Sequence, residues 1–543
     1  MLTRDEVSDD KLRGGFYSPD VLVDLCLARV SALLSPISKL RVLEPAAGDG
    51  AFLRGLHRSP LVQDVEHVEA VEINEADAAK AAEELSRLNL AGKVVHDNVL
   101  RWSTQAQSDY DLVLANPPYV RFQFISEEDK QRSRDIASQL GTAGNSVSNL
   151  WIPVFLISLA KLREGGVFSV ILPTEFLTGV SASAVRNWLI QNSTDLTIDL
   201  FKPGSFPAVL QEVLILTGRR TARSSERVAA VQFHDHNGGT RSWSHMVAAG
   251  LGTWTSFLLL PDQHQALVDA QSLASVRPIG EAARFSVSTV TGANNYFCLD
   301  REQVKSYRLE QWAIPMLPRS RYAEGLVYGE QDAAKLDDDG RPAWMLSFAA
   351  NKPSPIEHDG ASRYLARGQS LEIDKRFKCR VRTPWYRVPV VPAGDLLLSK
   401  RSNRFPRVIA NHAKVVTTDT IYRGLLLPSS SVTADDFTAT FHNSLTLLSA
   451  EIEGRSFGGG VLELVPSEVA SLRMPMMAGA GAELERLDRV ARESSDPEAL
   501  VVETDRLVAK LLPEVNDSLL ESLGSARETL LRRRLERGHS QFY

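Results

Sequence analysis

The stretch that decides the fold is residues 40–50, which read LRVLEPAAGDG. Four residues of strand character run into a turn of small residues, and a helical stretch follows. Gly48 and Gly50 allow the backbone of this turn to approach a ligand closely. A strand, a glycine turn and a helix in this order predict the start of an α/β domain, with ligands at the carboxyl ends of its strands.

The same alternation continues for about 200 residues. Strands are expected at 68–73, 94–97, 111–115, 167–172 and 213–217, and helices at 75–89 and 149–162. This pattern predicts a doubly wound, mostly parallel sheet. It loosens after about residue 245, where short β-like pieces and turns follow, and the last part is charged and helical. We expect an α/β domain at 1–245, a linker at 246–279, a mixed α+β domain at 280–478 and a helical segment at 479–543.

Length and composition limit the classes of protein to which this chain can belong. A chain of 543 residues exceeds what one core can hold, and 43% apolar with 24% charged residues is ordinary for a globular protein. The sequence contains no long apolar run or secretory leader, and its three cysteines lie far apart. These features predict a cytoplasmic protein without membrane spans, disulfides or a metal site.

Acidic residues close three successive predicted strands. Glu44 ends the first strand, Asp49 lies between the two glycines of the turn, Glu72 ends the second strand and Asp97 the third. Each could be a solvated strand end, but together they disfavour a phosphate ligand and favour a cationic nucleoside. Glu72 is placed for ribose hydroxyls and Asp97 for an adenine amino group, which suits S-adenosylmethionine. The predicted cofactor site also includes Pro45, Ala46, Gly48, Gly50, Ile73 and Asn98.

A second turn of unusual composition, Asn116-Pro117-Pro118-Tyr119, follows the apolar run at 112–115. Two prolines fix φ and remove two N–H donors, so the turn is stiff and rich in acceptors. Such a turn can hold the two N–H groups of an exocyclic amine, and the aromatic ring offers a face for a planar base. The alternative is a Pro-Pro turn that only ends a strand.

The motif order resembles that of the gamma class of DNA adenine-N6 methyltransferases. It runs Gly15-Phe16-Tyr17-Ser18-Pro19, residues 44–50, Glu72, Asp97 and residues 116–119. The resemblance implies a class I S-adenosylmethionine-dependent fold, with a target-recognition domain at 280–478. It also implies that Tyr17, Ser18 and Pro19 lie over the methionine part of the cofactor and that Asn116 and Pro118 line both the catalytic and the cofactor site.

The resemblance implies a reaction as well. The Asn116 side-chain oxygen and the Pro117 carbonyl would accept from the adenine amino group and so localise its lone pair. Catalysis would then rest on alignment of the amino nitrogen with the methyl donor, without a metal. Because a duplex hides this amino group, the base should be flipped out, with Tyr119 on one face and Phe206 as the second aromatic wall.

The net charge of −6 hides a basic segment. Residues 362–423 carry 14 Lys/Arg against 4 Asp/Glu, a local net charge of +10, which leaves −16 for the remainder. A charge run is often only a solvated face, but cations interleaved with aromatics are typical of DNA contact surfaces. The predicted DNA-binding residues are Lys375, Arg376, Lys378, Arg380, Arg382, Trp385, Arg387, Lys400, Arg401, Arg404 and Arg407.

Two turn-rich segments, at 290–295 and 457–462, are similar to segments in the recognition halves of type II restriction–modification adenine methyltransferases. The alternative is that their glycines serve packing alone.

These features predict a site-specific adenine-N6 DNA methyltransferase of a restriction–modification system, acting on duplex DNA. Two alternatives remain: a methyltransferase with the same turn that acts on RNA or on a protein glutamine, and a non-catalytic DNA-recognition subunit. Because no nuclease motif is evident, cleavage should belong to a separate cognate endonuclease. We expect this chain to act as a monomer.

Overall fold

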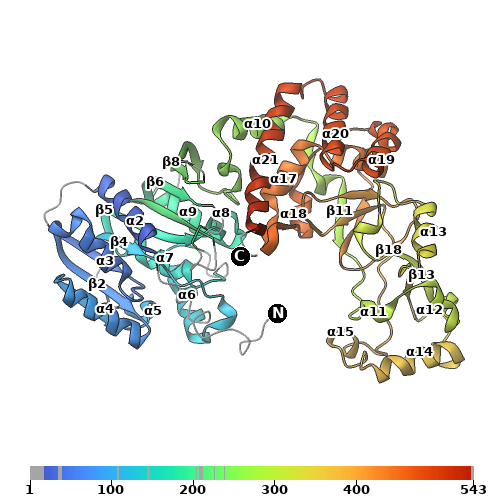
Figure 1. The fold of residues 1–543 in the computed structure, drawn as a ribbon, viewed down its shortest axis with the longest axis horizontal. Helices are drawn as coiled ribbons and strands as arrows, with labels where there is room; N and C mark the ends of the chain where they lie inside the picture. The colour runs from blue at the N-terminus through green and yellow to red at the C-terminus, as the bar shows by residue number, and fades with distance from the viewer. Residues whose placement is uncertain are drawn as a thin grey trace. The chain divides into compact units, whose positions relative to one another are not determined.

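A computed structural model describes residues 18–34, 39–106, 109–142, 147–202, 205–206, 212–224, 227–237 and 239–539. The chain forms two compact units, Met1–Pro261 and Asp262–Tyr543 (Figure 1). Within the described residues, every helix is too short or too polar to span a lipid bilayer.

The N-terminal unit is built on a nine-stranded sheet of order β3-β2-β1-β4-β5-β7-β6-β8-β9. The strands are β1 (Leu40–Glu44), β2 (Val65–Glu72), β3 (Gly92–His96), β4 (Tyr110–Ala115), β5 (Leu162–Pro173), β6 (Ser193–Leu200), β7 (Val213–Arg220), β8 (Val228–Asp235) and β9 (Arg241–Ala248). The helices are α2 (Asp20–Leu33), α3 (Ala51–Arg58), α4 (Glu75–Arg87), α5 (Val99–Trp102), α6 (Glu127–Gln139), α7 (Trp151–Ala160), α8 (Glu175–Thr178) and α9 (Ser183–Asn192).

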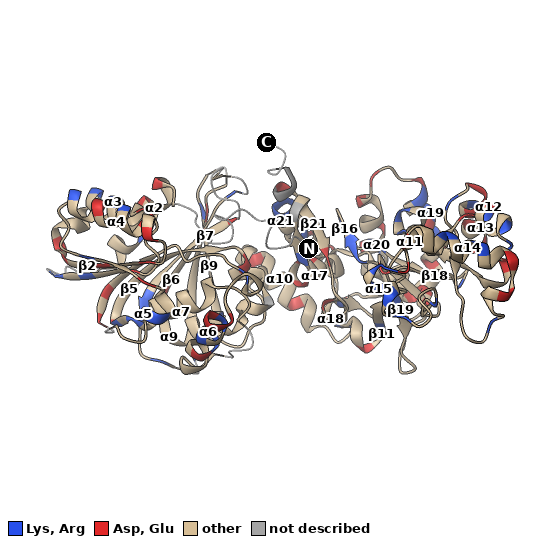
Figure 2. Ribbon diagram, turned by 90° about the horizontal axis from the view of Figure 1, so that it is seen from below, with Lys and Arg blue, Asp and Glu red and all other residues tan. Residues whose placement is uncertain are grey.

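The first five strands are parallel neighbours, and the chain reverses at β7, which pairs antiparallel with both β5 and β6. Helices cover both faces: Figure 2 shows α2, α3 and α4 on one face of the sheet and α5, α7 and α9 on the other. The predicted doubly wound α/β fold is therefore confirmed. The sequence pattern missed β6, β8 and β9, which extend the sheet beyond β7.

The C-terminal unit is a mixture of small sheets and helices. Its strands are β10 (Val276–Pro278), β11 (Ala283–Val287), β12 (Cys298–Leu299), β13 (Ala313–Leu317), β14 (Trp344–Leu346), β15 (Leu396–Ser399), β16 (Arg401–Ser402), β17 (Val408–Ala410), β18 (Val416–Thr417), β19 (Ile421–Leu426), β20 (Arg455–Phe457), β21 (Val461–Glu463) and β22 (Arg473–Pro475). Its helices are α11 (Asn294–Phe297), α12 (Arg301–Ser306), α13 (Glu330–Asp338), α14 (Asp359–Ser370), α15 (Phe377–Arg380), α16 (Ala434–Phe441), α17 (Ser444–Glu453), α18 (Pro466–Ser471), α19 (Leu484–Glu493), α20 (Glu498–Leu511) and α21 (Asp517–His539).

The segment predicted as a linker, 246–279, contains α10 (Pro261–Ser272) and β10, and β10 pairs with β22. The C-terminal helices belong to the same compact unit as residues 280–478. Assignment of separate roles to these segments stays a prediction.

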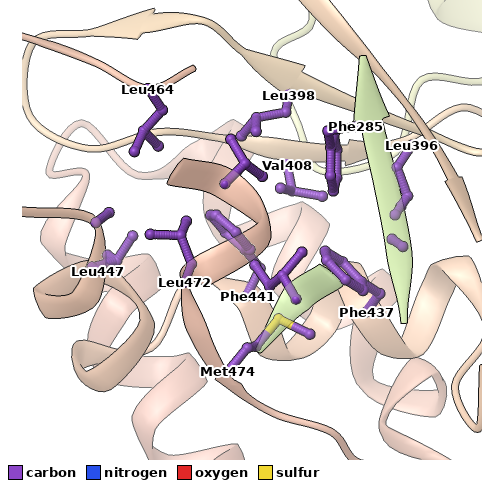
Figure 3. Packing of buried hydrophobic residues seen from close by; sticks show 14 of the residues in the cluster. Phe285, Leu396, Leu398, Val408, Phe437, Phe441, Leu447, Leu464, Leu472 and Met474 are labelled. Carbon is purple, nitrogen blue, oxygen red and sulfur yellow. The ribbon is translucent and has the colours of Figure 1, made fainter. Parts of the chain in front are cut away.

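One core of the C-terminal unit lies between one of its two four-stranded sheets, β11-β19-β15-β17, and helices α16 to α18. Figure 3 shows Phe285 of β11 and Leu396 of β15 facing Phe437 and Phe441 of α16. Phe441 is fully buried, and burial of each such aromatic side chain contributes roughly 1.5–3 kcal/mol.

A buried ion pair fixes the last helix to this core. Arg534 of α21 donates to both oxygens of Glu451 on α17, at 2.8 and 2.7 Å, and each side chain is only 4% exposed. The same guanidinium donates to the backbone carbonyls of Asn403 and Arg404, at 2.6 and 2.8 Å. Helix α21 is therefore part of the fold of this unit.

We expect Arg534→Ala to lower the free energy of unfolding by about 3–5 kcal/mol, because it leaves the Glu451 carboxylate buried without its partner. Chemical denaturation of the full chain, with hydrogen exchange of α21 as the local readout, measures this loss. The control is Arg532→Ala, an exposed cation on the same helix that should change stability by less than about 0.5 kcal/mol. Equal stability of the two variants would contradict the anchoring role.

Candidate active site

The carboxyl edge of the parallel strands collects side chains from distant parts of the sequence. Leu43 of β1 aligns with Val113 of β4, so Glu44 and Asn116 leave the sheet at neighbouring strand ends. Glu44 aligns with Ala70 of β2, and Glu72 with His96 of β3. Three acids therefore end three adjacent strands, beside the turn that begins at Asn116.

Glu44 is a buried carboxylate that lacks a complete set of partners. Its side chain lies in a residue only 2% exposed, and among the described residues its Oε2 atom has no hydrogen-bond partner. Burial, and next the negative charges of Asp49 and Glu72, raise the pKa of Glu44 well above its usual value. A cationic group bound beside Glu44 would offset both the cost of burying its negative charge and the repulsion from Asp49 and Glu72.

The glycine turn is shaped around Glu72. The backbone N–H of Gly48 donates to Glu72 Oε2 at 2.8 Å, and the N–H of Asn74 donates to Oε1 at 2.8 Å. Gly48 and Gly50 have φ of 54° and 85°, the left-handed region that only glycine enters without strain. Each carboxylate oxygen keeps a second lone pair, which can accept from a ribose hydroxyl.

The other two predicted acids are paired with arginines. Arg54 donates to Asp49 Oδ2 at 2.9 Å and to the Asp49 carbonyl at 2.8 Å. Arg101 donates to Asp97 Oδ1 at 2.7 Å, and this hydrogen bond lowers the pKa of Asp97. The predicted preference for a cation therefore rests mainly on Glu44. The pattern of an arginine four or five residues after each acid could have revealed this pairing.

These residues fit S-adenosylmethionine. The carboxylate of Glu44 has an unpartnered oxygen, the glycine turn leaves room for close approach, and Ile73 is 61% exposed between Glu72 and Asn74. An exposed isoleucine at this point can be covered by a planar purine. Asn98 caps α5 by accepting from the Leu100 N–H at 2.9 Å, so its side chain also has a structural role.

The predicted catalytic asparagine is held at both ends of its amide. Asn116 Nδ2 donates to Ser18 Oγ at 3.0 Å, and the Tyr119 hydroxyl donates to Asn116 Oδ1 at 3.0 Å. The same hydroxyl also donates to the carbonyl oxygen of Ile171 on β5 at 3.0 Å, so the two acceptors share its single proton. Burial raises the pKa of Tyr119 well above its usual value, so this hydroxyl remains a donor.

This arrangement gives Tyr119 a role that sequence reasoning missed. Its side chain is only 8% exposed and orients Asn116 through the hydroxyl, whereas contact of its ring with a base stays a prediction. Ser18 and Pro19 immediately precede α2, and Ser18 contacts Asn116 directly. Tyr17 lies outside the described residues.

Phe206, the predicted second aromatic wall, packs edge-on against Phe201, with ring centroids 5.2 Å apart. Phe201 in turn stacks on His236 at 5.3 Å, and Asp199 binds both His236 and Arg29 of α2, at 2.8 and 2.6 Å. No local pattern in the sequence indicates this support, because the residues that form it come from α2, the end of β6 and the segment after β8. The role of Phe206 stays a prediction.

Several residues of the predicted DNA surface have structural partners. Arg382 donates to the carbonyls of Thr291 and Val290, at 2.7 and 2.6 Å, and Arg407 to those of Ala323 and Glu324, at 2.9 and 3.3 Å. Trp385 is partly buried against a hydrophobic core. Ion pairs also occupy Lys375 with Glu372, Lys400 and Arg401 with Glu463, and Arg404 with Glu498.

The other four predicted cations, Arg376, Lys378, Arg380 and Arg387, are exposed. In the described part of the chain, none of them forms an ion pair or hydrogen bond with an acidic side chain. Among the predicted DNA-binding residues, these four cations are the most accessible to a polyanion.

Two family models match the chain. Residues 52–206 match the Eco57I restriction-modification methylase, and residues 251–509 match the C-terminal domain of the type II methyltransferase M.Eco57I. Both halves of the chain are thus related to type II restriction–modification methyltransferases. This confirms the predicted resemblance, and with it the methyltransferase fold carrying a separate C-terminal domain.

Individual proteins are also similar to this chain. The type II methyltransferase M.AccI of Acinetobacter calcoaceticus is 24% identical over 453 residues, 79% of each chain. A tRNA1(Val) (adenine(37)-N6)-methyltransferase of Escherichia coli O1:K1 / APEC is 28% identical over 160 residues, 29% of this chain and 60% of its own length. The crystal structure of the type IIG restriction endonuclease BpuSI aligns over 97% of this chain and 67% of its own, with 15% identity and a TM-score of 0.43.

We expect Glu44→Gln to weaken binding of S-adenosylmethionine by about tenfold or more, because the variant cannot supply a charge-assisted contact. Without cofactor, Glu44 adds to the free energy of unfolding only when it is protonated, because its pKa is raised in the folded state. This contribution is complete below the unfolded-state pKa of about 4.3 and is lost as the pH rises through the folded-state pKa. The variant without cofactor should therefore be at least as stable as the wild type at pH 8.

Calorimetric titration from pH 6 to 9, together with thermal unfolding, measures both effects. The control is Glu83→Gln, an exposed carboxylate on α4. If Glu44→Gln kept wild-type affinity at every pH, Glu44 would not face the cationic cofactor.

Proposed function

We propose that this chain is a site-specific DNA methyltransferase that transfers a methyl group to N6 of a flipped-out adenine in duplex DNA. The observation that carries the proposal is Asn116, fixed by Ser18 and Tyr119 at the strand end beside the unpartnered Glu44 carboxylate. We propose further that the methylated sites are those that a separate cognate endonuclease would otherwise cut, and that the chain acts as a monomer.

Two kinds of relative support adenine in DNA as the target. The named adenine-N6 methyltransferase resembles a stretch of 160 residues, which supports the amino group of adenine as the acceptor. The match to a type II methyltransferase C-terminal domain over 251–509 supports DNA, since this half carries the basic segment. Methylation of RNA is the second candidate, because the adenine-N6 relative is a tRNA enzyme.

The chain's own residues have defined tasks in this reaction. Asn116 Oδ1 accepts from the Tyr119 hydroxyl, and in the complex with DNA it would accept from the adenine amino group. Pro117, which is buried, would offer its carbonyl oxygen as the second acceptor. Two fixed acceptors hold the amino nitrogen in one orientation and favour its nucleophilic form.

Glu44, Glu72 and the glycine turn would hold S-adenosylmethionine, which supplies an activated methyl group when bound. Glu44 would contact the cationic part and Glu72 the ribose, with Ile73 against the purine and Ser18 beside the methionine part. Because Ser18 also accepts from Asn116, the two halves of the site are coupled through one hydrogen bond.

We expect Asn116→Ala to reduce methyl transfer by at least 100-fold, because the variant lacks the acceptor that orients the amino group. Transfer of radiolabelled methyl groups to unmethylated plasmid DNA measures this loss, and single-molecule sequencing locates the modified adenine. The matched control is Asn351→Ala, at an exposed position of the C-terminal unit. Near-normal transfer by Asn116→Ala at saturating cofactor and DNA would reject the mechanism.

We expect Tyr119→Phe to lower kcat by about tenfold, the equivalent of one hydrogen bond of roughly 1–1.5 kcal/mol, while KM for DNA changes little. The ring remains, so a stacking role predicts wild-type kinetics for this variant. A loss confined to Tyr119→Ala would therefore contradict the positioning role of the hydroxyl. Tyr322→Phe, in the C-terminal unit, is the control.

A further inference from the structure

The loop at 290–295 and the segment at 375–382 form one surface feature, which we name the α15 ridge after its helix. Arg382 donates to the carbonyls of Thr291 and Val290, and the buried Cys379 thiol lies 3.9 Å from the Thr291 carbonyl. Gly292 has a φ of 82°, and a Cβ atom there would lie 2.6 Å from Lys378 Cβ. The glycine is therefore required for α15 to sit on the loop.

The ridge exposes two large apolar side chains. Phe377 is 63% exposed and Val381 is 64% exposed, whereas Cys379 between them is fully buried. Residues four apart on a helical turn lie on the same side, so Phe377 and Val381 form one apolar edge. The buried Cys379 and the Arg382 clamp hold this edge outward, so its exposure follows from the fold.

Cations surround the apolar edge. The Arg380 guanidinium carbon and the Lys378 ammonium nitrogen lie 5.5 and 5.6 Å from the centre of the Phe377 ring. The preceding residue, Arg376, is also exposed, and residues 372–382 carry five Lys/Arg against two acids, Glu372 and Asp374, of which Glu372 pairs with Lys375. The surroundings of Phe377 are thus positive and suit a polyanion.

The small size of the apolar edge distinguishes between a protein partner and DNA. A stable protein interface buries about 800 Å² on each partner, far more than one phenylalanine and one valine offer. A single apolar side chain is enough, however, to enter between two base pairs and unstack them. Flanking cations are then placed to bind the phosphates on either side of that step.

We propose that Phe377 and Val381 act as an apolar wedge that inserts between adjacent base pairs of duplex DNA, while Arg376, Lys378 and Arg380 bind the flanking phosphates. The wedge kinks the duplex and thereby selects sequences that deform easily. This inference rests on the proposed function, since it takes DNA as the substrate. It also gives the loop at 290–295 a defined role as the seat of the wedge.

The test uses the full chain and a duplex of about 30 base pairs centred on the adenine located by sequencing, with a donor and an acceptor dye at its ends. We expect Phe377→Ala to weaken binding by about 10- to 100-fold and to reduce the change in energy transfer, with an unchanged salt dependence. Lys378→Ala and Arg380→Ala should each reduce the salt slope by about 1. Phe377→Trp should retain binding and bending.

The control is Val502→Ala, an exposed apolar residue of α20 that should bind and bend DNA as the wild type does. Wild-type affinity and bending by Phe377→Ala would overturn the wedge while leaving the proposed function intact. Failure of the wild type to bind any duplex would overturn the proposed function, and the wedge with it.

Discussion

The parallel register of β2, β1, β4 and β5 is the constraint on which the site depends. It brings Glu44, Glu72 and Asn116, which are far apart in sequence, to one edge of the sheet. At that edge, a single hydrogen bond from Asn116 to Ser18 joins the side that fits a cationic nucleoside to the side that would orient the acceptor base. A shift of one residue between β1 and β4 would turn these side chains to opposite faces.

In the C-terminal unit, arginines with different partners have different roles. The arginines that the sequence predicts as DNA contacts fall into two groups. Those of the first group bind backbone carbonyls or carboxylates, and those of the second group are exposed. Arg382 belongs to the first group and holds the ridge on which Arg380 of the second group stands. Cations with structural partners thus position the exposed cations, and fewer cations are accessible than the local net charge of +10 indicates.

The sequence predicted the strands β1 to β5 and the turns after them well, because short apolar runs ending in glycine, acid or proline are strong local signals. It did not predict β6, β8 and β9, where β6 pairs antiparallel with β7 and parallel with β8, and β8 and β9 form an antiparallel hairpin at the end of the sheet. Nor did it predict that Tyr119 donates to Asn116, because that contact depends on the buried path of the chain beside Ile171. The sequence likewise did not predict that Phe377 is exposed, since an isolated phenylalanine is more often part of a core.

The reaction proposed for this edge of the sheet is transfer of a methyl group to the amino group of adenine in duplex DNA. The most direct measurement offers the protein methyl-deuterated cofactor together with duplex DNA, transfer RNA and protein extract, and identifies the labelled product by mass spectrometry. The proposed reaction predicts label in N6-methyladenine from the duplex. Label in RNA, in protein or in N4-methylcytosine, with none in adenine of the duplex, would contradict it.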